Sequence, residues 1–241
     1  MKYAIVSGAE IDWPSDGRVS LTDSLGCAET QVELFRPGEN GSVAASTERE
    51  GVCVPLEASG RIVANKRVTV PSKGVACVPA GMGASLRGGG TWLMVSATTD
   101  ASPGELTVVD STDVEFDPPS TSTIDIARLT TRLGCTSMKV NLRRLEPGEA
   151  VPYHTEGSQE ELFVPLDGPG KILINEERYT MTAGSVSRVA PKTPRSVIND
   201  GEEQRTWFMI GAPPTGDADN WDPGAEILDW PDSSPVPDDS E

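Results

Sequence analysis

An internal repeat is the feature that most constrains the fold of this chain. Residues 25–39 and 133–149 both begin with LGC and end with PGE. Residues 52–67 and 162–177 share VPL, a glycine, an apolar triplet and an asparagine at a constant offset of 110. Residues 73–81 then resemble 183–192 with a slip of one or two positions. Because order and spacing are kept through both copies, the sequence predicts two copies of one structural unit.

Each copy consists of short runs rich in Val, Ile, Leu and Thr, separated by Gly, Pro and Asn about every 8–12 residues. This pattern is typical of an all-β sandwich or barrel. Helical periodicity is weak, and residues 122–134 are expected to add no more than a turn or two.

The predicted organisation has four parts. Residues 1–100 form an N-terminal unit and residues 124–214 a C-terminal unit. Residues 101–123 are polar and Pro-rich and are expected to connect the two, although ELTVVD at 105–110 could pair as a strand. Residues 215–241 form an acidic, Pro-rich tail whose last ten residues are expected to be disordered.

Charge excludes one class of function and indicates an environment. Asp and Glu number 37 against 20 Lys and Arg, for a net charge of −17, and no basic cluster suitable for nucleic acid is present. Lysine is scarce among the basic residues. This balance is typical of proteins kept soluble in concentrated salt and suggests a halophilic, archaeal source. An ordinary acidic cytosolic protein is the alternative.

No apolar run is long enough for a membrane span or a signal peptide, so we expect a cytoplasmic protein without membrane partners. Cys27, Cys53, Cys77 and Cys135 lie in apolar runs without CxxC spacing. They are expected to be small buried hydrophobic residues and not zinc ligands or disulfide partners.

His154 is the single histidine of the chain, and carboxylates follow it at Glu156, Glu160 and Glu161. Side chains alternate along a strand, so His154 and Glu156 are predicted to point to the same side.

These residues resemble the first motif of the cupin family. That motif is a glycine, a His-x-His pair, a glutamate and a strand that ends in glycine. Here it corresponds to Gly148, His154, Glu156, Glu161 and Gly168, with a glutamate in the place of the second histidine.

The second cupin motif is similar to residues 184–199, which supply Gly184, Pro191, Pro194 and Asn199. Arg195 stands where the family has a histidine. The match covers the C-terminal unit and, through the repeat, most of the N-terminal one. The resemblance implies two tandem cupin (jelly-roll) β-barrels.

The resemblance also implies a divalent metal in the mouth of the C-terminal barrel, held by His154, Glu156 and Glu161. Glu160 is the alternative to Glu161. Such oxygen-rich ligation favours Mn or Fe over Zn or Cu. A metal-free pocket remains the other interpretation, and a surface role for His154 a third.

Arg195 cannot bind a cation, because a guanidinium keeps its charge. Two roles stay open for Arg195. It could bind a carboxylate or phosphate of the substrate, or it could form an internal ion pair with Glu156 or Glu161 in place of a metal.

In the N-terminal unit, the positions equivalent to the three ligands are Ala44, Ser46 and Gly51, which cannot hold a metal. That unit is expected to be structural and to assist in forming a homodimer.

The sequence leaves two hypotheses for the function of the chain. One is a metal-dependent enzyme acting on a small polar metabolite by oxygenation, isomerisation or hydrolysis. The other is a non-enzymatic cupin that binds a small ligand or serves as an assembly scaffold.

Overall fold

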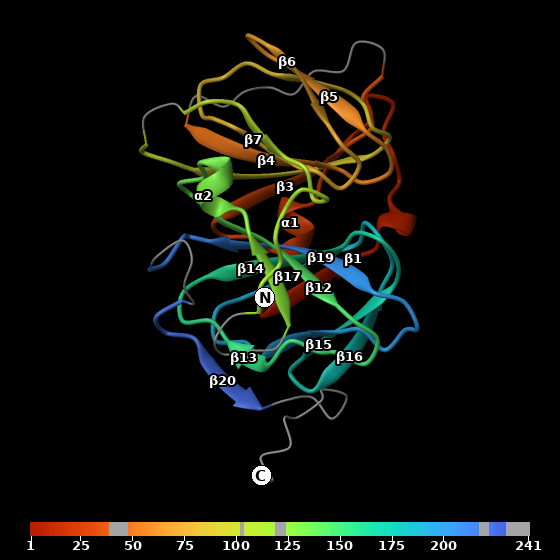
Figure 1. Cartoon of the computed structure of the whole chain (residues 1–241), viewed down its shortest axis with the longest axis vertical. Helices are drawn as coiled ribbons and strands as arrows, with labels where there is room; N and C mark the ends of the chain where they lie inside the picture. Colours follow the sequence, from red (N-terminus) through yellow and green to blue (C-terminus); the bar gives the residue numbers. More distant parts are fainter. Residues whose placement is uncertain (39–47, 102–103, 119–123, 217–221, 230–241) are drawn as a thin grey trace.

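Two six-stranded antiparallel sheets face each other across the middle of the molecule, one from each copy of the repeat. The computed structural model describes residues 1–38, 48–101, 104–118, 124–216 and 222–229. The strands of the N-terminal copy make the upper barrel in Figure 1 and those of the C-terminal copy the lower one.

The upper barrel closes its six-stranded sheet with a three-stranded one. The large sheet has the order β10 (Thr107–Val109), β7 (Val75–Val78), β4 (Arg49–Pro55), β9 (Trp92–Thr98), β3 (Thr30–Phe35) and β2 (Arg18–Ser20). The small sheet has the order β6 (Arg67–Val70), β5 (Gly60–Val63) and β8 (Ser85–Gly88).

The lower barrel repeats this arrangement. Its large sheet has the order β1 (Tyr3–Val6), β17 (Val186–Val189), β14 (Glu160–Pro165), β19 (Arg205–Ala212), β12 (Lys139–Leu145) and β11 (Asp125–Arg128). Its small sheet has the order β16 (Glu177–Met181), β15 (Gly170–Ile174), β18 (Arg195–Ile198), β13 (Tyr153–Thr155) and β20 (Glu226–Asp229).

Helices are confined to the 3-10 turn η1 (Gly8–Glu10) and the single turns α1 (Thr22–Leu25) and α2 (Thr130–Leu133) in the described part of the chain. The matching strand orders confirm the predicted all-β repeat.

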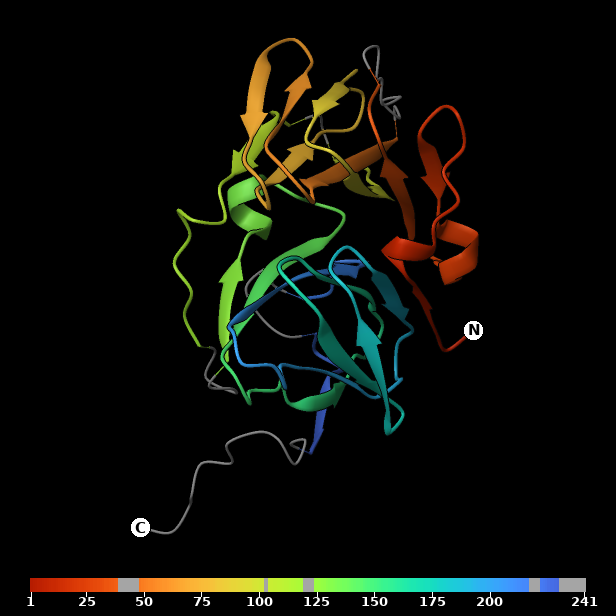
Figure 2. The same cartoon turned by 90° about the vertical axis from the view of Figure 1, so that its right-hand side faces the viewer.

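The first strand of each copy joins the sheet of the other copy. Strand β1 precedes the upper barrel in sequence but pairs with β17 of the lower one, and Figures 1 and 2 show it reaching down from the red N-terminal segment. Strand β10 precedes the lower barrel but pairs with β7 of the upper one. It lies in the segment 101–123 that was expected to be a connector. The β-branched triplet at 107–109 forms a strand there because β7 offers an edge with unpaired backbone groups.

An apolar layer fills the space between the two large sheets. Strand β12 shows how it is built: Val140 and Leu142 lie in this layer, whereas Lys139, Asn141 and Arg143 point into the lower barrel. The alternation follows from the two-residue period of a strand. Each large sheet therefore uses one face to join the barrels and keeps the other for its own interior.

Glu160 of β14 ties the lower barrel to the upper one at the rim of this layer. Its carboxylate accepts backbone N–H bonds from Ala28, Glu29 and Thr30 at 2.9–3.1 Å. The Arg188 guanidinium donates two more, at 3.0 and 2.8 Å. The carboxylate is buried, but its charge is fully hydrogen-bonded.

Glu50 makes the reciprocal connection from β4 of the upper barrel. It accepts hydrogen bonds from the backbone N–H and the hydroxyl of both Thr136 and Ser137, at 2.7–3.0 Å. No arginine bonds to Glu50 among the described residues, because the position equivalent to Arg188 is Cys77. The two carboxylates thus fix the relative position of the barrels from both sides.

The tail expected at 215–241 also contributes to the lower barrel. Asp222 accepts backbone N–H bonds from Ser158 and Gln159, and β20 pairs with β13. Polar composition predicted disorder at the chain end, but the last ten residues lie outside the described ones.

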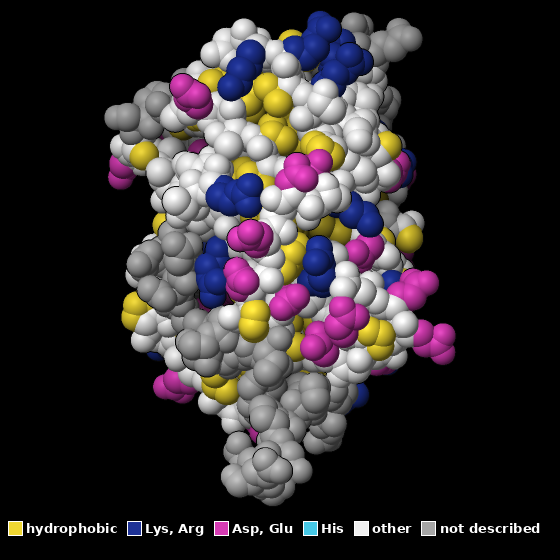
Figure 3. All heavy atoms as spheres, viewed as in Figure 1, with side chains coloured by type: hydrophobic (Ala, Val, Ile, Leu, Met, Phe, Trp, Pro, Cys, Tyr) yellow, Lys and Arg dark blue, Asp and Glu magenta, His cyan; other side chains and the backbone are white. Residues whose placement is uncertain are grey.

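Charged side chains of both signs are intermixed over the face in Figure 3, where no histidine side chain is visible. Within the described ranges, the helices are too short to cross a lipid bilayer.

Glu160→Gln is expected to lower the free energy of unfolding by about 3–5 kcal/mol, because it leaves the Arg188 charge buried without its partner. Glu50→Gln should cost less, about 1–3 kcal/mol, since only neutral donors lose an acceptor. Chemical denaturation of both variants measures the difference. Equal losses would contradict the interpretation of these two contacts.

Candidate metal centre

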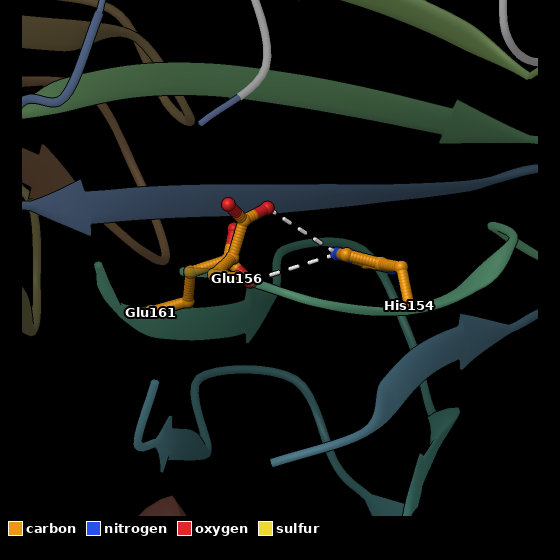
Figure 4. A group of neighbouring side chains, drawn as sticks. All are labelled: His154, Glu156 and Glu161. Atoms are coloured by element: carbon orange, nitrogen blue, oxygen red, sulfur yellow. Dashed lines mark ion pairs between the residues drawn. The ribbon is translucent and has the colours of Figure 1, made fainter. Parts of the chain in front are cut away.

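Strands β13 and β14 bring three candidate ligands together at the mouth of the lower barrel. One ligand atom from each of His154, Glu156 and Glu161 lies within 4.8 Å of the others. The imidazole faces both carboxylates, as Figure 4 shows, with Nε2 3.6 Å from Glu156 Oε1 and 3.8 Å from Glu161 Oε2. His154 and Glu156 are buried, and Glu161 is 9% exposed.

The second ring nitrogen of His154 has a defined role. Nδ1 lies 2.7 Å from the carbonyl oxygen of Pro152, and a carbonyl can only accept, so Nδ1–H donates. In the neutral ring the lone pair is then on Nε2, directed at the two carboxylates. This is the orientation that metal-binding histidines commonly have.

Each of the two carboxylates has a buried oxygen without a hydrogen bond to any described residue, and that of Glu161 is in an ion pair with Arg195. Glu156 Oε2 and Glu161 Oε2 have no hydrogen-bond partner among the described residues. Unpaired buried carboxylate oxygens are costly. Nε2 of a neutral His154, Glu156 Oε1 and Glu161 Oε2 converge at these distances, and this donor set fits a divalent cation with oxygen-rich ligation.

The sequence did not decide whether Glu160 or Glu161 is the third candidate ligand, and strand alternation places the two side chains on opposite faces of β14. Glu160 faces the upper barrel, where it accepts the bonds described above, and Glu161 faces the interior of its own barrel. Only Glu161 of the two is near His154.

Arg195 lies on β18, directly opposite His154 in the strand register. Its side chain is fully buried, and Nε is 3.1 Å from Glu161 Oε2. The two groups are at ion-pair distance, but the N–H is not aligned for a hydrogen bond. Nη2 donates to the carbonyl of Ala190. Arg195 is not part of the cavity wall described below.

The two carboxylates of the site differ in their acidity. Burial, followed by repulsion from Glu161, raises the pKa of Glu156 to about 9. Burial also opposes ionisation of Glu161, but Arg195 and then His154 and Arg143 together hold the pKa of Glu161 below its ordinary value. The site is therefore expected to hold one carboxylate and one carboxylic acid near neutral pH when no cation is present.

A cavity of about 70 Å³ opens beside the three candidate ligands. Arg128 of β11 and Lys139 and Arg143 of β12 also line it. Burial, and then repulsion from Arg128, lowers the pKa of Arg143 to about 10. Sequence reasoning missed these cations, although the alternating order of Lys139, Asn141 and Arg143 was a signal that they share one face.

The upper barrel has a different interior. Its cavity of about 200 Å³ is lined by residues such as Cys53, Met82 and Met94, with Gly51 at the position of Glu161. The other two equivalents, Ala44 and Ser46, lie outside the described residues. In the described part of the chain, the one group of histidine, cysteine and acidic residues spaced for a metal is that of the lower barrel.

Residues 141–211 match the family model of the cupin domain. No curated protein sequence matches the chain significantly.

Solved structures with the same architecture cover nearly the whole chain. A putative glyoxylate induced protein from Pseudomonas aeruginosa is 16% identical, with a TM-score of 0.68 over 90% of this chain and 91% of that one. Oxalate decarboxylase from Lactobacillus farciminis, solved as a formate complex, is 12% identical, with a TM-score of 0.69 over 93% and 88%. The protein Ylba from E. coli is 11% identical, with a TM-score of 0.69 over 90% and 93%. These likenesses show the fold, two tandem cupin barrels, as the sequence predicted.

The raised pKa of Glu156 gives the metal-free protein a specific pH dependence. Folding favours the protonated acid, so this contribution to stability is complete below the unfolded pKa of about 4.5 and is lost as pH rises through about 9. The unfolding free energy of the wild type should therefore fall relative to Glu156→Gln over this range, by at most roughly 1.4 kcal/mol per pH unit. Chemical denaturation at a series of pH values in the presence of a chelator measures this difference. If the unfolding free energies of the two proteins changed with pH in parallel, the raised pKa of Glu156 would be contradicted.

Proposed function

We propose that the chain is a cupin enzyme that holds one divalent cation, Mn or Fe, in its C-terminal barrel and acts on a small polar metabolite. The observation that carries this proposal is the orientation of His154, whose Nε2 faces Glu156 and Glu161 while Nδ1 is held by Pro152. A divalent cation placed between Nε2 and the two carboxylates would offset the negative charge that these buried groups carry when ionised.

The protein residues would divide the work. His154 and the two glutamates would hold the cation, which when bound would polarise a substrate oxygen as a Lewis acid. Glu156 would release its proton when the cation binds, because the ionised form is then favoured. Arg195 would keep Glu161 ionised and fixed in position. The sequence also predicted that Arg195 binds the substrate directly. That role would require the buried guanidinium to reach the cavity, whose wall does not include Arg195.

A non-enzymatic cupin without metal is the second candidate. The ion pair between Arg195 and Glu161 favours it, because an internal guanidinium can offset one buried carboxylate. Glu156 would then stay protonated, consistent with its raised pKa. The barrels would serve as a small-ligand binding or assembly scaffold.

Metal content separates the two candidates. Protein purified in high salt, as its acidic composition recommends, and loaded with Mn or Fe should contain about one equivalent by elemental analysis. Binding should be lost in His154→Ala and Glu161→Gln, since each removes one of three ligands. Glu202→Gln, an exposed carboxylate of the same barrel, is the matched control and should bind normally. Absence of metal under every loading condition would refute the proposal.

Arg195→His tests the electrostatic part of the proposal. The substitution replaces a cation beside Glu161 with an imidazole directly opposite His154, so metal affinity should rise by about tenfold or more. Arg195→Lys keeps the charge and should not show this gain. Competition with a metal-binding dye gives the affinities, and a value for Arg195→His equal to the wild type would show that residue 195 does not act on the site.

A further inference from the structure

Three cationic side chains of the lower barrel are not used by the proposed metal centre, although they line the same cavity. Lys139 and Arg143 flank Asn141 on one face of β12, and Arg128 of β11 is paired with Asn141 in the strand register. Arg128 thus lies diagonally next to both other cations, within reach of long side chains. Like charges at such positions repel each other.

The protein satisfies these groups only in part. Arg143 is buried, and its Nη1 donates to the carbonyl of Ile124 at 3.1 Å. Arg143 Nε and Asn141 Oδ1 have no hydrogen-bond partner among the described residues. A buried guanidinium next to a second one, with a donor left over, is a site that an anion would complete.

The carboxylates around the cavity do not balance these charges. Asp222 is occupied by backbone N–H groups of Ser158 and Gln159. Glu161 is paired with Arg195. Glu156 is close enough to Lys139 for the lysine to act on its pKa. Glu161 acts on the charge of Arg143 but is itself paired with Arg195, and neither Arg128 nor Arg143 forms an ion pair with a carboxylate among the described residues.

The upper barrel serves as an internal comparison. The equivalents of Arg128, Lys139 and Arg143, read from the matching strand registers, are Ser20, Gln31 and Phe35. None of these three equivalents is charged; the upper cavity has arginines at other positions, Arg18 and Arg49, and Arg18 is paired with Glu33. Two clusters of opposite charge that line one cavity point to a single ligand that contacts both.

We propose that Arg128 and Arg143 bind the carboxylate of a small anionic substrate, whose other end faces His154, Glu156 and Glu161. A guanidinium matches a carboxylate with two parallel hydrogen bonds. The cavity of about 70 Å³ is small, so a small carboxylate is the expected ligand. The term substrate rests on the proposed function, but binding of the anion itself does not require the metal.

Calorimetric titration of the full chain with sodium oxalate, and with its neutral diamide oxamide, tests this inference in both metal-free and metal-loaded protein. Oxalate should bind and oxamide should not. Arg128→Gln and Arg143→Gln should each weaken oxalate binding by about tenfold or more. Arg128 is only half-buried, so its variant should fold even if the Arg143 variant does not.

Arg178→Gln, an exposed arginine on β16 of the same barrel, is the matched control and should bind oxalate as the wild type does. Three results would overturn the inference: no oxalate binding in either form, equal binding of oxamide, or wild-type affinity in Arg128→Gln. The metal proposal and the anion site would be refuted by different results. A chain that takes up no metal but binds oxalate through Arg128 would refute the metal centre and leave the anion site standing.

Discussion

The two-residue period of β14 connects the assembly of the molecule with its chemistry. Glu160 points out of the lower barrel and accepts bonds from the upper one, and Glu161 points inward to His154. A shift of one residue would exchange them, leaving a charge in the apolar layer and removing a ligand from the cavity. The contact that joins the barrels therefore also fixes which carboxylate reaches the site.

The two buried arginine–glutamate pairs of the lower barrel have different consequences. Arg188 and Glu160 form a complete network, in which backbone N–H groups and two guanidinium bonds surround the carboxylate. Arg195 and Glu161 are close but leave donor and acceptor atoms without partners. A complete network makes a structure rigid, whereas an incomplete one marks a place where something else binds. This contrast, more than burial itself, distinguishes Glu160 from the candidate ligand Glu161.

Duplication preserved the scaffold and changed the interior. In each barrel a tryptophan packs on a glycine of the small sheet, Trp92 on Gly60 and Trp207 on Gly170, so closely that a Cβ on either glycine would overlap the indole. Such contacts keep the backbone of both copies alike. Inward positions such as Gly51 and Glu161 do not join the barrels, and they are free to diverge. The lower cavity contains the imidazole, Glu156 and Glu161, whereas the upper one has Gly51 at the position of Glu161 and methionines such as Met82 and Met94 in its wall.

The sequence by itself determined the repeat, the all-β class and the three candidate ligands, because strand periodicity and motif spacing are local properties that short segments carry. Tertiary structure alone decided three other points. It placed β1 and β10 in the sheet of the opposite copy, decided which of Glu160 and Glu161 faces His154, and brought Arg128 and Arg143 to the cavity that holds His154. These outcomes depend on pairing between residues far apart in the chain. The local sequence pattern cannot specify which strands pair, because any strand with an apolar face could occupy the same place in the sheet.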